Sequence, residues 1–88
     1  MSFPQLTDPE RKLLSCLLGF YREVGPGATP GIPGLDEEAG LERHELDEAV
    51  RELRGKGLIE YWELQPAVRL TREGLLLAQR LEAERGDD

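Results

Sequence analysis

Cysteine and histidine are almost absent from this 88-residue sequence, with one residue of each. A single Cys16 cannot form an internal disulfide, and Cys16 and His44 together cannot complete a zinc site. The longest uninterrupted apolar run, 75–78, is too short to cross a membrane, and the first ten residues lack the pattern of a signal peptide. We therefore expect a cytoplasmic protein without metal, cofactor or membrane segment.

Basic residues are also scarce. Eleven Lys and Arg stand against eighteen Asp and Glu, which gives a net charge of −7. Residues 1–34 are neutral in sum, whereas residues 35–57 carry −4 and residues 58–88 carry −3. Affinity for nucleic acid comes mostly from Lys and Arg that neutralise phosphates. The charge distribution therefore disfavours unaided DNA binding, above all in the second half of the chain.

The sequence lacks the groupings that catalysis requires. Neighbouring acids such as Glu37-Glu38 point about 100° apart on a helix and do not converge on one ligand. Cys16 lies among apolar helix positions, where a thiol is usually a packing residue. We find no nucleophile beside a base and no phosphate-binding Gly-Lys-Ser/Thr sequence, so we expect no enzymatic activity.

What the sequence does contain is a regular series of elements within one domain, 1–88. The capping-box spacing Thr7-Asp8-Pro9-Glu10 predicts a first helix over 7–24, followed by a Gly/Pro loop over 25–34. Two helices on either side of Gly40 are predicted over 35–56, a hairpin around Gln65-Pro66 over 58–70, and a last helix over 72–85. The expected fold is mostly α with a small β-hairpin (α+β), in the order helix, helix, helix, hairpin, helix.

Three groups of residues carry a resemblance to a known family. They are Leu35, Ala39, Gly40, Leu41, Leu46, Ala49 and Val50 at helix-turn-helix spacing, then Gly57-Leu58-Ile59, then the run from Arg69 to Gly74. Over residues 6–82 the sequence resembles the winged helix-turn-helix superfamily, especially small bacterial transcription regulators of the PadR and MarR type. The resemblance implies a domain in which the helix from about residue 42 to 54 meets DNA bases and the hairpin, called the wing, meets the flanking DNA.

The second helix of this motif departs from that pattern on its outward side. Helical spacing turns the core positions inward and the following residues outward: His44, Asp47, Glu48, Arg51 and Glu52. Three carboxylates thus accompany one guanidinium. Asp47 is spaced to pair with Arg51, and His44 with Glu48. We therefore expect this acidic side to suit a protein partner better than DNA.

The wing also differs from DNA-binding members of the family by carrying acidic residues. Its outer positions include Glu60 and Glu63, where DNA-binding relatives place Arg or Lys. Tyr61 and Trp62 are consecutive in a strand and so face opposite sides of the hairpin, which leaves one ring outside the core. That ring is either a candidate anchor for a partner or a ring that lies over the hairpin and is half covered by it.

Surplus leucines predict self-association. Leu14 and Leu18 widen the apolar stripe of the first helix beyond half its circumference, and Leu76 projects away from the inward positions of the last helix. We expect a homodimer built from these two helices.

Two functions fit these patterns. The first is a non-catalytic binding module whose acidic helix and aromatic wing bind a protein with a basic surface. The second is a dimeric DNA-binding transcription regulator that uses Arg43, Arg51, Arg54 and Arg69. Local charge favours the first, and the family resemblance favours the second.

Overall fold

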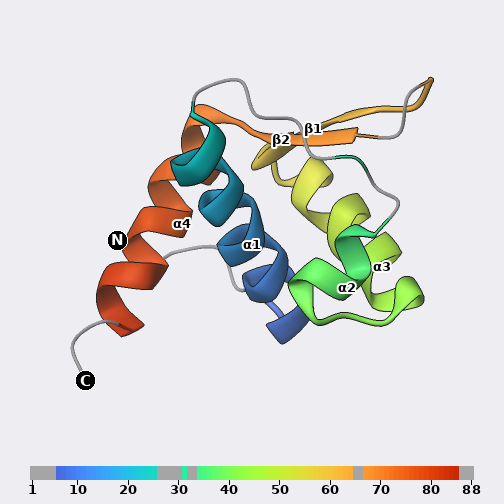
Figure 1. Ribbon diagram of the computed structural model, residues 1–88, viewed down its shortest axis with the longest axis horizontal. Coiled ribbons are helices and arrows are strands. Elements are labelled where there is room, and N and C mark those ends of the chain that lie inside the picture. Colours follow the sequence, from blue (N-terminus) through green and yellow to red (C-terminus); the bar gives the residue numbers. More distant parts are fainter. Residues whose placement is uncertain (1–5, 26–30, 32–33, 65–66, 86–88) are drawn as a thin grey trace.

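The computed structural model describes residues 6–25, 31, 34–64 and 67–85. Its elements are α1 (Asp8–Val24), α2 (Leu35–Ala39), α3 (Arg43–Gly55), β1 (Ile59–Trp62), β2 (Ala67–Leu70) and α4 (Arg72–Arg85). Figure 1 shows α1 between α4 and the α2–α3 pair, with the hairpin across one end and its tip extending past α3. The predicted fold class and order of elements are confirmed. Most of the Gly/Pro loop and Gln65-Pro66 lie outside the described residues.

Helix α1 begins with the capping box that its sequence predicts. The Glu10 N–H donates to Thr7 Oγ1 at 3.4 Å, and the Thr7 N–H donates to Glu10 Oε1 at 2.8 Å. Pro9 occupies the first turn, where its missing N–H costs nothing. Two of the unpaired N–H groups at this helix end are thereby satisfied.

The turn between α2 and α3 depends on Gly40. Its φ of 72° lies in the left-handed region, which glycine adopts without the steric penalty of a Cβ. The Leu41 N–H donates to the Asp36 carbonyl at 2.7 Å across this turn. Glu42 then occupies the N-cap position of α3, and its N–H donates to Glu45 Oε1 at 2.9 Å.

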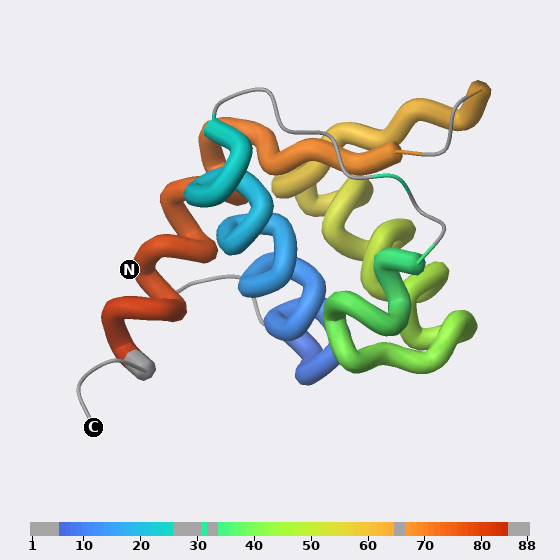
Figure 2. Tube along the Cα trace, in the orientation of Figure 1, coloured from blue at the N-terminus to red at the C-terminus, as the bar shows by residue number. Residues whose placement is uncertain are grey.

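The wing is an antiparallel pair in which Ile59 faces Leu70 and Trp62 faces Ala67. Gly31 adds one isolated antiparallel bridge to Ala67, on the opposite side of β2 from β1. The Gly/Pro loop thus contributes a pairing position that its composition did not predict. At the other end of the hairpin, β2 leads into α4 close to the end of α1 (Figure 2).

One apolar core joins all these elements, and α1 lies at its centre. Leu13, Leu14, Leu17 and Leu18 are each 3% exposed or less, and they pack with buried residues of α2, α3, the wing and α4. The prediction that Leu14 and Leu18 are left over for a second chain is therefore wrong, because the other helices and the wing cover the whole width of the stripe. Leu76 alone of that set remains outside, at 55% exposed.

The junction of wing and α4 explains the Thr-x-x-Gly sequence at 71–74. Thr71 Oγ1 donates to the Gly57 carbonyl at 2.7 Å and accepts from the Gly74 N–H at 3.1 Å. The Thr71 N–H donates to the Leu58 carbonyl at 3.1 Å. A Cβ on Gly74 would lie 1.9 Å from that same carbonyl oxygen, so only glycine allows this approach.

Candidate binding surface on helix α3 and the wing

Helix α3 presents the predicted site residues to solvent. We call His44, Asp47, Glu48, Arg51 and Glu52 the α3 face, and all five are exposed. On the opposite side, Leu46, Ala49, Val50 and Leu53 are buried against the core. The helix is therefore held by its apolar side while its charged side is open to a partner.

The charges of the α3 face are not neutralised locally. Among the described residues, Asp47, Glu48, Glu52 and Arg51 form no ion pair. The predicted pair between Asp47 and Arg51 is therefore not formed. His44 does not pair with Glu48 either: its Nδ1 lies 3.5 Å from Glu42 Oε2.

The two arginines at the wing are, by contrast, already engaged. Arg69 donates to Glu60 Oε1 at 2.6 Å, and its guanidinium carbon lies 5.3 Å from the centre of the Trp62 ring. Arg54 lies 3.7 Å from Glu63 Oε1 and 5.7 Å from the centre of the Tyr61 ring. Such exposed pairs add little stability, but each offsets a positive charge that DNA would otherwise attract.

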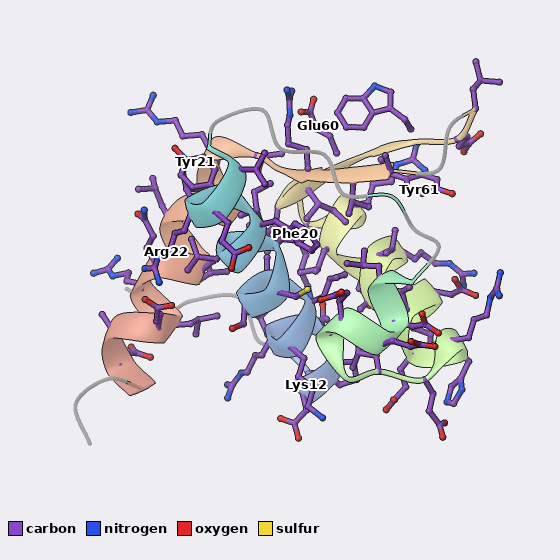
Figure 3. All side chains as sticks on the ribbon, in the orientation of Figure 1. Lys12, Phe20, Tyr21, Arg22, Glu60 and Tyr61 are labelled. Carbon is purple, nitrogen blue, oxygen red and sulfur yellow. The ribbon has the colours of Figure 1, made fainter. Side chains whose placement is uncertain are left out.

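The wing separates its two aromatic rings. Figure 3 shows Glu60 on the outer side of the hairpin and Tyr61 on the side that faces α3. Tyr61 is half-buried against the core, whereas Trp62 is 41% exposed. Trp62 is therefore the outward ring, and Leu64 beyond it is fully exposed.

A buried ion pair fixes α3 against α1, and no sequence pattern predicted it. Glu10, 2% exposed, accepts a hydrogen bond from Lys56 Nζ at 2.5 Å. Burial alone would raise the pKa of the Glu10 carboxyl, but the hydrogen bonds from Lys56 and Thr7 outweigh it and lower that pKa below its ordinary value. The carboxylate thus caps α1 and holds the end of α3 at the same time.

Two grooves flank the α3 face. One, of about 350 Å³, lies between α3 and the start of α1. It is lined by Thr7, Pro9 and Glu10 from the start of α1 and by Glu48, Ala49, Arg51 and Glu52 from α3. The other, of about 290 Å³, lies between α3 and the wing and is lined by Asp47, Val50, Arg51, Arg54 and Tyr61. Both far exceed the roughly 10–15 Å³ that a single water requires, so each can admit a side chain.

Three further features bear on the kinds of site that the described part of the chain can hold: grouped metal ligands, membrane-spanning helices and the state of the Cys16 thiol. Within residues 6–25, 31, 34–64 and 67–85, no three His, Cys, Asp or Glu side chains are grouped as metal ligands would be. None of the helices over these ranges combines the length and apolar character needed to span a bilayer. Burial and the nearby Glu38 carboxylate raise the pKa of the Cys16 thiol, which disfavours the reactive thiolate.

Two solved structures share this fold. A MarR-family transcription regulator from Silicibacter pomeroyi DSS-3 matches with a TM-score of 0.71 and 26% identity, over 91% of this chain and 54% of that one. A protein from Ralstonia eutropha JMP134 with a provisional assignment as DNA-binding matches with a TM-score of 0.74 and 25% identity, over 88% and 98% of the two chains.

The chain thus spans about half the length of the MarR-family regulator and nearly all of the second protein. No protein-family model matches the sequence, and no curated protein does. The arrangement of α2, α3 and the wing, together with these two likenesses, shows that the chain folds as a winged helix-turn-helix domain similar to that of a MarR-family transcription regulator.

Proposed function

We propose that this domain is a non-catalytic, transcription-regulator-like module that binds a protein partner through the α3 face and the wing. The partner presents basic side chains to the carboxylates of α3. Trp62 and Leu64 supply the apolar contacts, since exposed aromatic and aliphatic side chains often lie at the centre of an interface.

One observation carries this proposal. The carboxylates of Asp47, Glu48 and Glu52 are exposed and without an ion pair in the described part of the chain, while Arg54 and Arg69 are each held by a glutamate. The two wing arginines that would attract DNA are offset, whereas the three carboxylates that would attract a basic protein are not offset by any described residue. Complementary charges of this kind steer association and select among partners.

A second candidate, DNA binding, rests on a different observation. Arg43 and Arg51 are exposed and form no ion pair with any described residue, and the two similar structures are a transcription regulator and a protein assigned provisionally as DNA-binding. In this alternative, two copies of the chain together supply enough guanidinium groups to neutralise phosphates.

A paired measurement distinguishes the two functions. We compare the wild-type protein with the variant Asp47→Asn/Glu48→Gln/Glu52→Gln, in capture of partners from cell extract and in binding to mixed genomic DNA fragments. The core side of α3 is unchanged, so the variant should fold normally, as circular dichroism can verify. If the proposal holds, the variant loses the captured protein, and capture by the wild type weakens at raised salt because the pairing charges are screened.

The matched control is Glu37→Gln/Glu38→Gln, which removes charge of the same sign from α2, at residues that line neither of the two grooves. It should retain the captured protein. Unchanged capture by the α3 variant, combined with firm DNA binding by the wild type, would replace the proposal by the second candidate.

A further inference from the structure

The outer edge of β1 carries backbone groups that pair with no described residue. In an antiparallel pair of strands, hydrogen-bonded and non-hydrogen-bonded positions alternate. The Thr71 N–H donates to the Leu58 carbonyl at 3.1 Å, and these two residues continue the register of the wing, so they form a hydrogen-bonded position. Glu60 is then the next hydrogen-bonded position along β1. Ile59 and Tyr61 therefore direct their N–H and C=O groups away from β2.

Tyr61 is the accessible position on this edge. Ile59 is 3% exposed, whereas Tyr61 is half-buried and the three residues after it are exposed. The other strand has partners on both sides, because β2 pairs with β1 and, at Ala67, with Gly31. Within the described residues, the wing thus has an unpaired edge at Tyr61, and such an edge is a template for a further strand.

A groove borders the same edge. Strand β1 lies against α3, whereas β2 lies against α1 and α4, so the outer edge of β1 adjoins the groove of about 290 Å³ between α3 and the wing. Val50 and the Tyr61 ring form apolar parts of its lining. Its charges are balanced, because a carboxylate of α3 accompanies Arg51 and because Arg54 is offset by Glu63. The groove therefore fits an apolar side chain better than a charged one.

An added strand would use the edge and the groove together. Neighbouring strands lie about 4.8 Å apart, and residues directly opposite each other place their side chains on the same face. The residue opposite Tyr61 would point towards α3 and enter the groove, while its two neighbours would lie opposite Glu60 and Trp62 on the outer face. Figure 3 shows Glu60 and Tyr61 on these two sides of the hairpin. Trp62, at 41% exposed, offers apolar surface on the outer side.

We infer that the outer edge of β1 binds an extended segment of the partner protein, which adds a strand to the wing and places an apolar side chain in the groove beside α3. The N–H and C=O groups of Tyr61 bond to the backbone of this segment, and the groove selects its side chain. This inference rests on the proposed function and specifies the partner's conformation at the wing. The partner's basic residues meet the carboxylates of the α3 face.

Two other occupants fit this edge less well. DNA has no peptide groups with which to extend a strand. A second copy of the chain would pair through its own β1, and α3 lies against that strand in each copy. Asp47, Glu48 and Glu52 pair with no described residue, so the two sets of carboxylates would approach each other without bases to offset them. A separate, extended protein segment is the occupant that avoids this repulsion.

A short peptide tests strand addition directly. The probe is an acetylated and amidated peptide, Lys-Thr-Val-Thr-Val-Thr-Lys, whose valines share one face when it is extended. It is titrated into the ¹⁵N-labelled full chain at about 0.15 M ionic strength, near the physiological value. The peptide should shift the amide signals of Val50 and Tyr61 saturably. It should also slow hydrogen exchange of the Tyr61 amide about tenfold or more, because that N–H gains an acceptor.

The matched control is the same peptide with its five central amides N-methylated. It keeps the side chains and the charge but lacks the donors on both of its edges. The Tyr61 carbonyl then has no donor, and the methyl groups obstruct the close approach of two strands. The methylated peptide should bind the wild-type chain about tenfold more weakly or worse.

Variants of Tyr61 separate its backbone from its ring. Tyr61→Val and Tyr61→Pro both lose the ring and its contact with Arg54, but proline also lacks the N–H that points away from β2. Proline is compatible with an edge strand where its nitrogen faces away from the ladder, so the hairpin should still form, as circular dichroism can verify. Tyr61→Pro should bind the unmethylated peptide about fivefold more weakly than Tyr61→Val, as expected for one backbone hydrogen bond.

Equal binding of the two peptides to the wild-type chain, or an unprotected Tyr61 amide in the bound state, would overturn the inference whether or not Tyr61→Pro folds. Protection of that amide that rises with protein concentration in the absence of peptide would assign the edge to a second copy instead. The proposed function fails differently. In that case the peptide adds to β1 as expected, but no protein is captured through the α3 face.

Discussion

Gly74 shows how one residue controls the position of a whole helix. With hydrogen in place of a side chain, it lets the first turn of α4 lie against the Leu58 carbonyl, to which the Thr71 N–H also donates. This contact joins the wing to the helix that packs on α1. Backbone contacts thus hold the base of the wing in place. These contacts join the segments 57–59 and 69–74, which are two of the three that carry the resemblance to winged helices.

We predict that Gly74→Ala lowers the free energy of unfolding by about 2–3 kcal/mol or more, because its Cβ would overlap a backbone oxygen that cannot move alone. The matched control is Gly19→Ala. A Cβ on Gly19, within α1, would have no atom within 4 Å, so alanine there should stabilise by about 0.5–1 kcal/mol. Urea denaturation of both variants gives the comparison. Equal effects would show that the close approach at Gly74 does not exist.

Glu10 is the second residue with effects beyond its own helix, because its carboxylate accepts from both Thr7 and Lys56. We predict that Glu10→Gln costs about 1–3 kcal/mol at neutral pH, as loss of a buried charged hydrogen bond does. The folded pKa of Glu10 lies below the ordinary 4.5. Its contribution is therefore fully present above about pH 4.5 and is lost as the pH falls through the folded pKa.

Urea midpoints of wild type and Glu10→Gln across this range provide the measurement. The two curves should converge on acidification. A gap that stays constant down to the lowest pH at which the protein folds would mean that the charge of Glu10 contributes nothing.

At the scale of elements, local chemistry was sufficient to predict which segments become helix or strand. The starts of α1 and α4 are set by side-chain hydrogen bonds over three residues, and such spacings are visible in sequence. The contacts between elements were not visible. Glu10 and Lys56 are 46 residues apart, and the cover over Leu14 and Leu18 comes from other helices and the wing.

The same distinction applies to the binding surface. Helical periodicity correctly predicted which side of α3 faces solvent, but it could not predict what lies on either flank. Only the packing places α1 beside Glu48 and Glu52, and the wing beside Asp47 and Arg54. The pairing of the wing arginines with glutamates therefore appeared only in three dimensions.

The wing pairs lead to a prediction of their own. Glu60→Gln/Glu63→Gln removes the carboxylates that hold Arg69 and Arg54, so both guanidinium groups become available to phosphates. We expect non-specific DNA affinity at low salt to rise about three- to tenfold, with a steeper dependence on salt. Fluorescence anisotropy with a labelled duplex measures both. The variant Glu37→Gln/Glu38→Gln changes the net charge equally. An equal rise in that control would attribute the effect to net charge alone.

At the scale of the whole molecule, self-association remains a prediction, but its residues have changed. Leu14 and Leu18 are internal, whereas Leu76 lies on the outer side of α4 with the exposed Ala83 two turns further on. We predict that the chain dimerises through this side of α4 and that Leu76→Arg weakens dimerisation about tenfold or more, since burying a leucine contributes roughly 1.5–3 kcal/mol. Sedimentation velocity over micromolar concentrations measures this. A wild-type protein that stays monomeric throughout would disprove the dimer.

The central claim, that the exposed side of α3 binds protein and not DNA, is tested most directly by selection from a random DNA duplex library with the wild-type chain at about 0.15 M salt. Asp47, Glu48 and Glu52 pair with no described residue, and the wing arginines are engaged by glutamates. We therefore predict that no sequence is enriched over the starting pool and that the retained duplexes bind no more tightly than unselected ones. Enrichment of one defined sequence, bound at nanomolar concentration at that salt, would contradict the account and establish the domain as a DNA-binding regulator.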